Sequence, residues 1–410
     1  MKIELAYDSG QLTLDLPLNV QVDTFRPAVV SNPPDIDDFS DGFARAGGDT
    51  FLSQGPPLIV VNDGHRNTPT ATILQWLHQQ YPDLIESATF LVATGTHDPP
   101  SQIHLRKIFG PLLKQLEGHI SYHDAIDKSH LTAIGRDNFD CEVMVNTALT
   151  EHPRVLIIGS VEPHYFAGFT GGRKSIFPGL ADFETVARNH NLANSLQAAP
   201  LKLAGNPVAE HLDSLLGLLN LKRFFAIQVI TDSLGRIVDL FFGPLDSAFQ
   251  QATVVAEKTY SFPVKQHYHA AICEVLPPMD KNLYQTQKAL ENCQAAVRDG
   301  GHIIIVSACR EGIGSEHFYQ LATDWDRQTN QPHDGRPQFG SHKLSRVIAH
   351  SRRLGVWLYS TLPDEVVRHV FYEPLDNPEI FLYSAVKNCQ PCRLAVVYDA
   401  ANTVLRAGKD

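Results

Sequence analysis

Cysteine, basic residues and long apolar runs are all scarce in this sequence, and each scarcity excludes a class of protein. Six cysteines in 410 residues, mostly far apart, do not make a disulfide framework and indicate a reducing compartment. Lysine and arginine number 34 against 45 aspartates and glutamates, so the net charge of −11 argues against a nucleic-acid or anionic-membrane surface. No stretch approaches the roughly eighteen apolar residues of a membrane-spanning helix.

What remains is the composition of a folded protein. Hydrophobic residues make up 43% and charged residues 19% of the chain, as in ordinary globular domains. The first ten residues lack the charged start, apolar run and cleavage site of a secretory signal, so we expect a cytoplasmic location, with neither nucleic-acid nor membrane partners. At 410 residues the chain exceeds what one hydrophobic core usually organises, so we predict two domains.

Short apolar runs alternate with helical patterns, which predicts an α/β fold with mostly parallel sheets. Such strand-like runs lie at 58–61, 90–92, 155–158, 270–275, 302–306, 356–359 and 394–397, and a hairpin is expected around 233–236. We place the domain boundary at 261–263. Residues 1–262 then form an N-terminal α/β domain that carries the reactive residues. Residues 263–410 form a Rossmann-like α/β domain that closes over the site, which we expect in the cleft between the two.

Ionisable residues directly follow three of the predicted strands. Asp63 and Arg66 come after the first, His97 after the second and His164 after the third. The carboxyl ends of parallel strands lie at one edge of a sheet, where ligands bind, so we expect these side chains to converge. A single histidine is more often structural, but three polar loops at equivalent strand ends predict a functional site.

A glycine-rich loop that ends in a lysine follows His164. Residues 165–179 read YFAGFTGGRKSIFPG, which is not a P-loop, because Arg173 stands where glycine must precede the lysine. Backbone N–H groups of such a loop can still approach an anion, with Lys174 at the end of the loop. Beyond it, Asp182 is expected to cap a helix whose apolar face carries His190.

Together these residues resemble the nickel-dependent lactate racemase family, whose members are racemases and epimerases of 2-hydroxy acids. The resemblance rests, in chain order, on Asp63-x-x-Arg66, Gly-Thr-His97, Glu-Pro-His164, Ala-Gly-Phe-Thr-Gly-Gly-Arg-Lys174, His190 and Tyr284-Gln285-x-x-Lys288. The intervals of 10 residues from His164 to Lys174 and of 16 residues from Lys174 to His190 agree with the family pattern.

The resemblance implies a cofactor, the nickel-pincer nucleotide, a pyridinium mononucleotide whose sulfur and carbon atoms hold nickel. Lys174 would be tethered to it covalently, and His190 would supply the remaining metal ligand. The other implied cofactor-binding residues are Asp63, Thr170, Gly171, Gly172, Tyr284, Gln285 and Trp357. Enzymes of cofactor synthesis would be partners, and protein made without them would lack the cofactor.

The resemblance also implies a reaction, which is inversion of C2 of a 2-hydroxy carboxylate by reversible hydride transfer. Hydride removal gives a planar 2-keto acid that accepts hydride on either face, whereas proton removal would leave a carbanion without a good electron sink. His97 and His164 would be the two acid/base groups, since histidine has a pKa of about 6.5. Arg66 and Lys288 would bind the substrate carboxylate.

The substrate region departs from the family pattern at two positions. His65 stands where the family commonly has threonine, and Asp98 stands where it commonly has arginine. We therefore expect a substrate other than lactate, such as malate or a sugar acid. Because a net charge of −11 would repel an anion, Arg66, Arg173, Lys174 and Lys288 are expected to make the pocket locally basic.

Two other functions stay open at this point. A zinc-dependent hydrolase would use the same histidines, and a non-catalytic organic-acid binding protein would show affinity without turnover. The Cys389-Gln390-Pro391-Cys392 segment has the spacing of half a zinc site, but without a second pair it is interpreted as two structural thiols.

Overall fold

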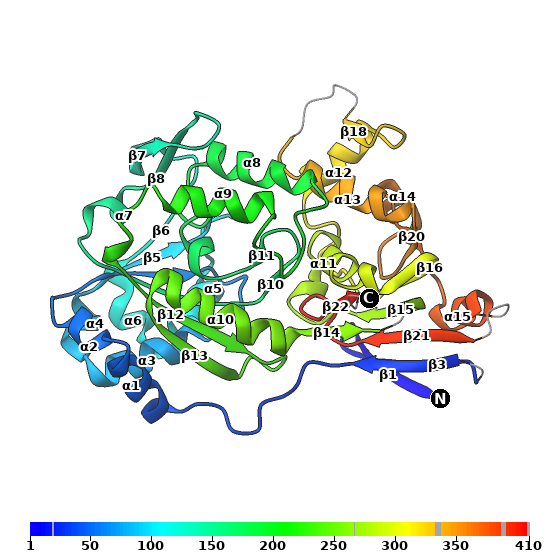
Figure 1. Ribbon diagram of the computed structural model, residues 1–410, viewed down its shortest axis with the longest axis horizontal. Coiled ribbons are helices and arrows are strands. Elements are labelled where there is room, and N and C mark those ends of the chain that lie inside the picture. Colours follow the sequence, from blue (N-terminus) through cyan, green and yellow to red (C-terminus); the bar gives the residue numbers. More distant parts are fainter. Residues whose placement is uncertain (19, 266, 333–337, 387–390, 408–410) are drawn as a thin grey trace. The chain divides into compact units, whose positions relative to one another are not determined.

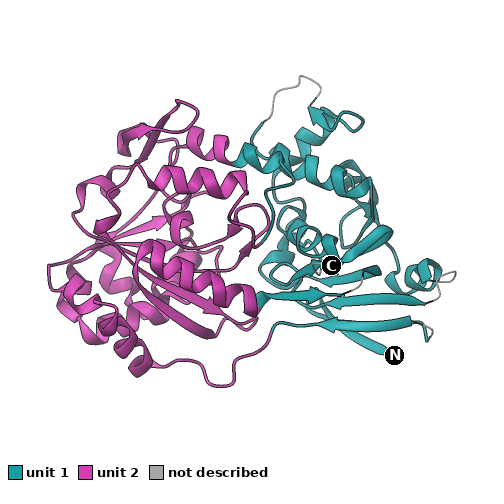
Figure 2. Cartoon of the chain, viewed as in Figure 1, with its two compact units in different colours: residues 1–27, 190–200, 260–410 teal, residues 28–189, 201–259 magenta. Residues whose placement is uncertain are grey.

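The computed structural model describes residues 1–410 except 19, 266, 333–337, 387–390 and 408–410, so Cys389 lies outside the described residues. The chain forms two compact units, each made of separate segments (Figure 2). Unit 1 comprises residues 1–27, 190–200 and 260–410, and unit 2 comprises residues 28–189 and 201–259.

The compact units do not coincide with the expected domains 1–262 and 263–410. Residues 1–27 belong to unit 1, because strand β3 (Val20–Phe25) pairs with β21 (Cys392–Val397) at the edge of its sheet. The expected linker at 261–263 is strand β14 (Ser261–Val264), which pairs in parallel with β22 (Val404–Ala407). Both differences arise from pairing between strands that are far apart in sequence.

Unit 2 is built on a six-stranded sheet in the order β13-β12-β9-β4-β5-β6 (Figure 1). Its strands are β4 (Leu58–Asn62), β5 (Thr89–Ala93), β6 (Ile120–Tyr122), β9 (Val155–Ser160), β12 (Phe224–Thr231) and β13 (Ile237–Pro244). All neighbouring pairs are parallel except β12 and β13, which form the expected antiparallel hairpin. The continuous apolar runs are explained by burial, since every residue of β9 is buried.

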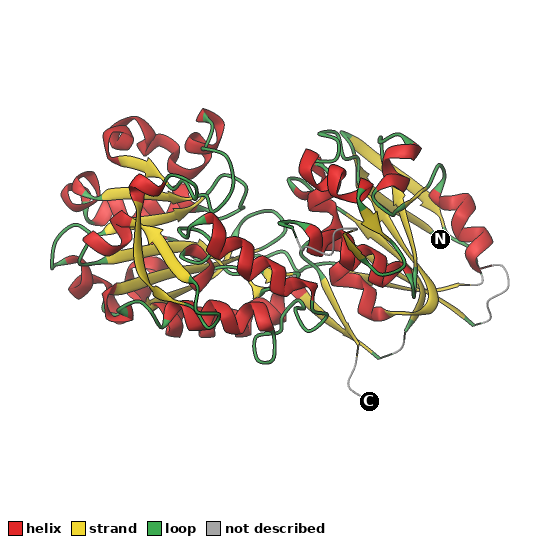
Figure 3. Ribbon diagram, turned by 90° about the horizontal axis from the view of Figure 1, so that it is seen from above, coloured by secondary structure: helices red, strands yellow, loops and turns green. Residues whose placement is uncertain are grey.

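Helices lie on both faces of this sheet (Figure 3). The helices that lie wholly or mostly in unit 2 are α1 (Ile36–Arg45), α2 (Gly48–Leu52), α3 (Thr70–Gln80), α4 (Pro82–Ser87), α5 (Gln102–Phe109), α6 (Leu113–Leu116), α7 (Thr147–Glu151), α8 (Phe183–Asn191), α9 (Pro207–Leu216) and α10 (Leu245–Tyr260). Smaller strands form two hairpins, β7 (Leu131–Arg136) with β8 (Glu142–Asn146), and β10 (Pro163–His164) with β11 (Gly168–Phe169). The Ser101 hydroxyl accepts a hydrogen bond from the His104 N–H and caps α5.

Unit 1 has its own six-stranded sheet, in the order β20-β19-β16-β15-β21-β3, and all its neighbouring strands are parallel. The strands of this sheet not yet introduced are β15 (Tyr268–Glu274), β16 (Val297–Val306), β19 (Gly355–Tyr359) and β20 (Glu373–Pro374). Unit 1 also has two antiparallel hairpins, β1 (Lys2–Tyr7) with β2 (Gly10–Asp15), and β17 (Trp325–Asp326) with β18 (Gln331–Pro332). One face packs against the β1–β2 hairpin and α15 (Pro378–Val386). The other packs against α11 (Leu283–Cys293), α12 (Glu316–Thr323), α13 (Ser341–Ser351) and α14 (Asp364–His369).

The α/β fold class predicted from the sequence is confirmed by these two mostly parallel sheets. Each of the seven predicted apolar runs lies in a strand or extends one residue beyond it. Among the residues described, there is no helix with the length and apolarity needed to cross a bilayer.

Candidate active site

The loops that follow β4, β5 and β9 are joined by hydrogen bonds at one edge of the unit 2 sheet. The Asn62 amide donates to the Thr68 hydroxyl at 2.8 Å, and the Thr68 hydroxyl lies 2.9 Å from that of Ser160. The Gly95 N–H donates at 3.0 Å to the carbonyl oxygen of Gly179, in the loop that follows Lys174. The strand ends are thus brought together as the parallel topology predicts.

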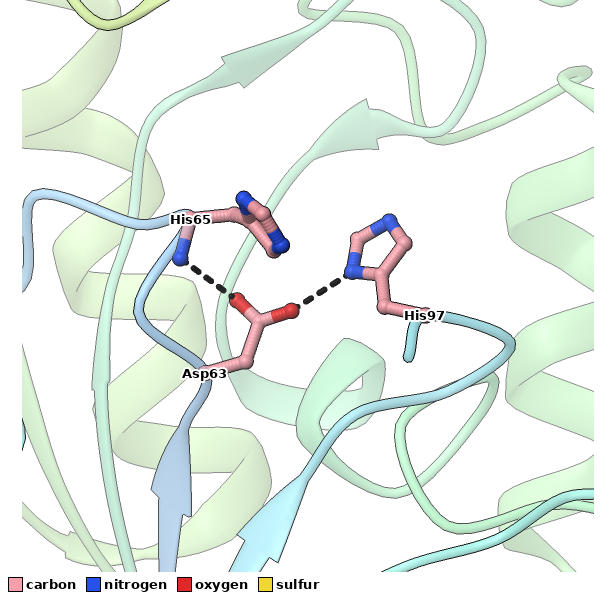
Figure 4. A group of neighbouring side chains, drawn as sticks. All are labelled: Asp63, His65 and His97. Carbon is pink, nitrogen blue, oxygen red and sulfur yellow. Dashed lines mark hydrogen bonds and ion pairs between the residues drawn. The ribbon is translucent and has the colours of Figure 1, made fainter. Parts of the chain in front are cut away.

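Asp63 and His97 form a hydrogen-bonded pair at this edge (Figure 4). His97 Nδ1 lies 2.6 Å from Asp63 Oδ2, and the carboxylate is buried whereas the imidazole is 47% exposed. Burial alone would raise the pKa of Asp63. The hydrogen bond from His97 and the positive charges of His97 and Arg66 outweigh it and lower that pKa. An ionised Asp63 holds the Nδ1 proton of His97 and leaves Nε2 as the free acceptor.

His65 and Arg66 extend from the same turn as Asp63. The His65 N–H donates to Asp63 Oδ1 at 3.2 Å, and the His65 ring lies 4.9 Å from that of His97 and 4.7 Å from that of His104. Arg66 is half-buried, and over the residues with described positions its guanidinium makes no hydrogen bond or ion pair. This guanidinium is therefore available to bind an anion.

His164 and Lys174 form a second pair in unit 2. His164 is buried on β10, and its Nδ1 accepts a hydrogen bond from the Ala167 N–H at 3.2 Å. Its Nε2 lies 3.4 Å from Lys174 Nζ, which also lies 5.3 Å from the centre of the Phe166 ring. Because Nδ1 accepts, the proton of a neutral His164 resides on Nε2, on the side of the lysine.

The residues just before Lys174 use their polar groups to build the loop. The Thr170 hydroxyl accepts from the Glu162 N–H at 2.9 Å and donates to the Ser160 carbonyl at 3.0 Å. The Gly172 N–H donates to Gln228 Oε1 at 2.7 Å. These groups hold the loop against β9 and β12, and the contact of Thr170 and Gly172 with a nucleotide stays a prediction.

Gly171 shows why this loop needs glycine. Its φ is +71°, and an added Cβ would lie 2.6 Å from Val161 Cγ2 and 2.8 Å from the Ser160 carbonyl oxygen. The loop passes so close to β9 that no side chain fits. Lys174 follows in the 3₁₀ turn Gly172–Ser175, where its N–H donates to the Gly171 carbonyl at 2.9 Å.

Arg173 does not add charge to the pocket as the sequence analysis expected. It is buried, forms an ion pair with Asp213 and lies over the Phe249 ring at 5.2 Å from the ring centre. An ion-paired, buried guanidinium is a structural group, because its charge is compensated by its neighbour.

Helix α8 leads from unit 2 to His190. Asp182 caps the helix as predicted, accepting from the Thr185 N–H at 3.1 Å. Farther along α8, Arg188 Nε donates to Asp137 at 2.8 Å and the Asn189 amide donates to the Val208 carbonyl at 3.2 Å. These contacts anchor α8 in unit 2 up to Asn189.

From His190 onward the chain packs in unit 1. The half-buried His190 ring lies 5.6 Å from that of Phe339 and 6.0 Å from that of His342. Burial, followed by the nearby positive charges of His190 and Lys343, lowers the pKa of His342 well below its ordinary value. His190 therefore faces an imidazole that stays uncharged near neutral pH.

A buried ion pair that the sequence analysis did not identify holds the segment after His190. Arg346 binds Glu291 through two hydrogen bonds of 2.8 and 2.6 Å. The third nitrogen of Arg346 donates to the carbonyl oxygens of Ala193, Ser195 and Ala198 at 3.2, 3.3 and 2.9 Å. No local motif marks this pair, because its members lie on α11 and α13, and Arg346 binds backbone atoms some 150 residues away.

The predicted residues of α11 lie on one face of the unit 1 sheet. Lys288 Nζ lies 3.0 Å from Met279 Sδ, and the buried Lys343 donates to the Tyr284 carbonyl at 2.7 Å. The Gln285 backbone N–H donates to the Asn282 side chain at 3.0 Å. Lys343 therefore lies against Tyr284, and burial, followed by the charge of Lys288, lowers the pKa of Lys343 well below its ordinary value.

Trp357 is not brought together with these α11 residues. It lies in the middle of β19, and its ring packs 4.4 Å from that of Phe381 on the opposite face of the sheet. The buried neighbours Val356 and Leu358 face the α11 side instead. Strand alternation explains the difference, since successive side chains point to opposite faces.

The predicted site residues thus fall into two groups. Asp63, Arg66, His97, His164, Thr170, Gly171, Gly172 and Lys174 belong to unit 2, and His190, Tyr284, Gln285, Lys288 and Trp357 belong to unit 1. A shared cleft that joins the two groups stays a prediction.

Comparison with known proteins gives a consistent result. Two family models match the sequence, the lactate racemase N-terminal domain over residues 50–200 and the lactate racemase C-terminal domain over residues 275–334. The lactate racemase of Thermoanaerobacterium thermosaccharolyticum is 27% identical over 335 residues, which cover 81% of this chain and 74% of that protein. The lactate racemase of Lactiplantibacillus plantarum is 30% identical over 275 residues, which cover 66% of this chain and 64% of that protein.

Solved structures agree on the fold. The lactate racemase apoprotein of Thermoanaerobacterium thermosaccharolyticum matches with a TM-score of 0.85 and 23% identity, over 99% of this chain and 100% of that one. A Thermotoga maritima protein matches with a TM-score of 0.69 and 16% identity, over 92% of this chain and 99% of that one.

Proposed function

Because this chain belongs to the lactate racemase family and is an isomerase, we propose that it racemises or epimerises a 2-hydroxy carboxylate at C2 through a lysine-tethered nickel-pincer nucleotide. The observation that carries the proposal is that two imidazole pairs, Asp63–His97 and His164–Lys174, lie at joined strand ends of one unit. The substrate, the cofactor and a cytoplasmic location remain parts of the proposal.

The protein groups present fit such a cofactor. Lys174 would hold it covalently, because its amine is half-buried, at the end of a rigid loop and 3.4 Å from His164 Nε2. His190 would be the protein ligand of nickel, which favours nitrogen and sulfur donors in planar sites. When bound, the nucleotide supplies a hydride acceptor that can return hydride to either face of a 2-keto acid.

The tautomer of His164 suits the formation of the tether. With Nδ1 accepting from the Ala167 N–H, the Nε2–H is directed at Lys174 Nζ. An Nε2–H that donates to Lys174 Nζ would require the uncharged lysine amine, which is the nucleophilic form. To exchange a proton with substrate, His164 must then release the Ala167 N–H, so that either ring nitrogen can carry the proton.

His97 is arranged to take the proton of the substrate hydroxyl. Asp63 holds the Nδ1 proton at 2.6 Å, so Nε2 has a free lone pair and the imidazolium that forms is stabilised by the carboxylate. Arg66 would bind the substrate carboxylate with two hydrogen bonds, which holds C2 in one orientation. Lys288, in unit 1, would be a second carboxylate ligand.

Whether the substrate is lactate depends on the surroundings of His97. The His65 ring is 4.9 Å away from the His97 ring, and Asp98 is exposed next to it. A substrate with a longer polar tail than a methyl group would meet these side chains. We therefore propose a 2-hydroxy acid such as malate or a sugar acid.

The direct test is the intact mass of protein coexpressed with cofactor-synthesis enzymes. We expect added mass localised to Lys174 with one nickel per chain, and neither in Lys174→Ala. The loaded protein should then racemise one or more members of a panel of 2-hydroxy acids. Unmodified Lys174, or loaded protein that binds these acids without turnover, would contradict the proposal and favour an organic-acid binding protein.

A further inference from the structure

His65 is a third side chain of a type that can bind metal, next to the Asp63–His97 pair, and it has no acid/base role in the reaction proposed above. We infer that Asp63, His65 and His97 form a binding site for a divalent transition-metal ion of the zinc class. One potential ligand atom from each of the three side chains lies within 4.8 Å of the other two. Figure 4 shows the two histidines beside the Asp63 carboxylate, with Asp63 and His65 on one loop and His97 on another.

The geometry needs little change to accept an ion. Zinc bonds to nitrogen and oxygen of about 2.1 Å place neighbouring ligand atoms about 3.4 Å apart in a tetrahedron. The Asp63 Oδ2 to His97 Nδ1 distance of 2.6 Å must open to about 3.4 Å as the ion takes the place of the shared proton. His65 lies on the same turn as Asp63, and the centre of its ring is 4.9 Å from that of the His97 ring.

The donor set selects the class of ion. Two imidazoles with one carboxylate match zinc and other divalent first-row metals, whereas magnesium and calcium prefer oxygen ligands. Asp63 supplies a carboxylate whose two oxygens already lie against the other two residues, Oδ1 accepting from the His65 N–H at 3.2 Å and Oδ2 lying 2.6 Å from His97 Nδ1. Three protein ligands leave a fourth position for water or a substrate oxygen.

Neighbouring groups hold the ligand-bearing turn. Lys107 Nζ donates to the Gly64 carbonyl at 3.1 Å, and an added Cβ on Gly64 would lie 2.4 Å from the His104 ring. The His104 ring in turn lies 4.7 Å from that of His65. Groups of this kind orient metal ligands and reduce the ordering that binding requires.

Occupation would have a consequence for catalysis, and this consequence rests on the proposed function. An ion at this site binds His97 Nδ1 and Asp63, so the pair can no longer hold the proton that makes Nε2 a base. Free zinc should therefore inhibit turnover in competition with protons. Binding itself requires neither the nucleotide nor a substrate, so the two ideas can be tested separately.

The binding experiment is calorimetric titration of zinc into metal-stripped full-length protein that lacks the nucleotide. We expect one zinc per chain, release of protons on binding, and affinity at least about tenfold weaker in His65→Ala and in His97→Ala. The control is His78→Ala, which removes a histidine from the two-membered pair with Glu86, 3.0 Å apart. His78→Ala should bind zinc like the parent protein.

Cobalt provides a readout that does not depend on calorimetry. Visible d–d absorption of bound Co²⁺ should appear in the parent protein and be lost in His65→Gln, with thermal unfolding recorded to show that each variant is folded. Absence of one-equivalent binding, or equal affinity in folded His65 and His97 variants, would overturn the inference. Zinc binding in a protein that takes up no nucleotide would contradict the proposed function and leave the metal site standing.

Discussion

Single residues in this protein are defined by their hydrogen-bond partners more than by their type. His97 and His164 both follow parallel strands, but His97 Nδ1 is paired with a carboxylate and His164 Nδ1 with a backbone N–H. The two imidazoles therefore present different atoms to a ligand, one a lone pair and the other an N–H. A sequence motif identifies both histidines and does not distinguish these states.

Replacing His97 or Asp63 tests this difference. His97→Ala should lower the kcat of loaded enzyme by about 10²-fold or more, since it removes a general base. Asp63→Asn should also lower kcat, because an amide does not stabilise the imidazolium. The measurement is racemisation rate at matched nucleotide content, determined by mass, so that a loss of cofactor is not mistaken for a loss of catalysis.

The pH dependence of activity tests the consequence of the lowered pKa of Asp63. Because the pKa of Asp63 is lowered, its carboxylate stays ionised as the pH falls through the ordinary aspartate range near 3.9. Any loss of activity on acidification above that pH should then come from protonation of imidazole groups alone. An Asp63→Asn variant that keeps the parent's kcat at every pH would contradict the assigned role.

Much of the site was predictable at this scale, and the exceptions have a common cause. Asp63, His97, His164 and Lys174 were found because turn-rich loops after buried strands carry them. The hydrogen bonds that Thr170 and Gly172 make within the protein were not predicted, because their partners are set by the path of the loop over β9 and β12. Contacts of that kind are tertiary and leave no local pattern.

At the scale of elements, the segment 190–200 depends on a buried pair contributed by two helices. Glu291 on α11 and Arg346 on α13 bind each other, and Arg346 also binds three backbone carbonyls of that segment. Removing the carboxylate leaves a buried, uncompensated guanidinium. Glu291→Ala should therefore lower the free energy of unfolding by about 3–5 kcal/mol.

The same pair makes a pH-dependent contribution to stability. Burial alone would raise the pKa of Glu291, but the charges and hydrogen bonds of Arg346 and His350 depress it far below its ordinary value. A depressed folded-state pKa gives stability that is present above the unfolded-state pKa of about 4.3 and is lost as the pH falls below it. Denaturant unfolding of the parent and Glu291→Gln across that range should show a smaller acid dependence in the variant.

The sequence predicts which segments form strands better than it predicts which strands pair with one another. The apolar runs of β4, β5 and β9 identified buried strands because both faces of the sheet are covered. The pairing of β3 with β21 joins residues about 370 positions apart, and no short-range pattern specifies it. The face occupied by Trp357, in contrast, follows from strand alternation and was open to prediction.

At the scale of the whole molecule, the chain passes between the units after residues 27, 189, 200 and 259. A fragment of residues 263–410 lacks both β3, the edge strand of its sheet, and the segment bound by Arg346. We expect this fragment to be unfolded or aggregated, and addition of residues 1–27 and 190–200 to be needed for a folded unit 1. Circular dichroism and limited proteolysis would decide, and a cooperatively folded 263–410 fragment would contradict the packing described.

The passage at 189/190 also separates two residues that are only 16 positions apart, since Lys174 belongs to unit 2 and His190 to unit 1. Under the proposed function, one nucleotide bonded to both is a cross-link between two bodies of the fold. Loading should therefore raise the temperature of calorimetric unfolding, and stripping the nickel while the tether to Lys174 remains should lower it again.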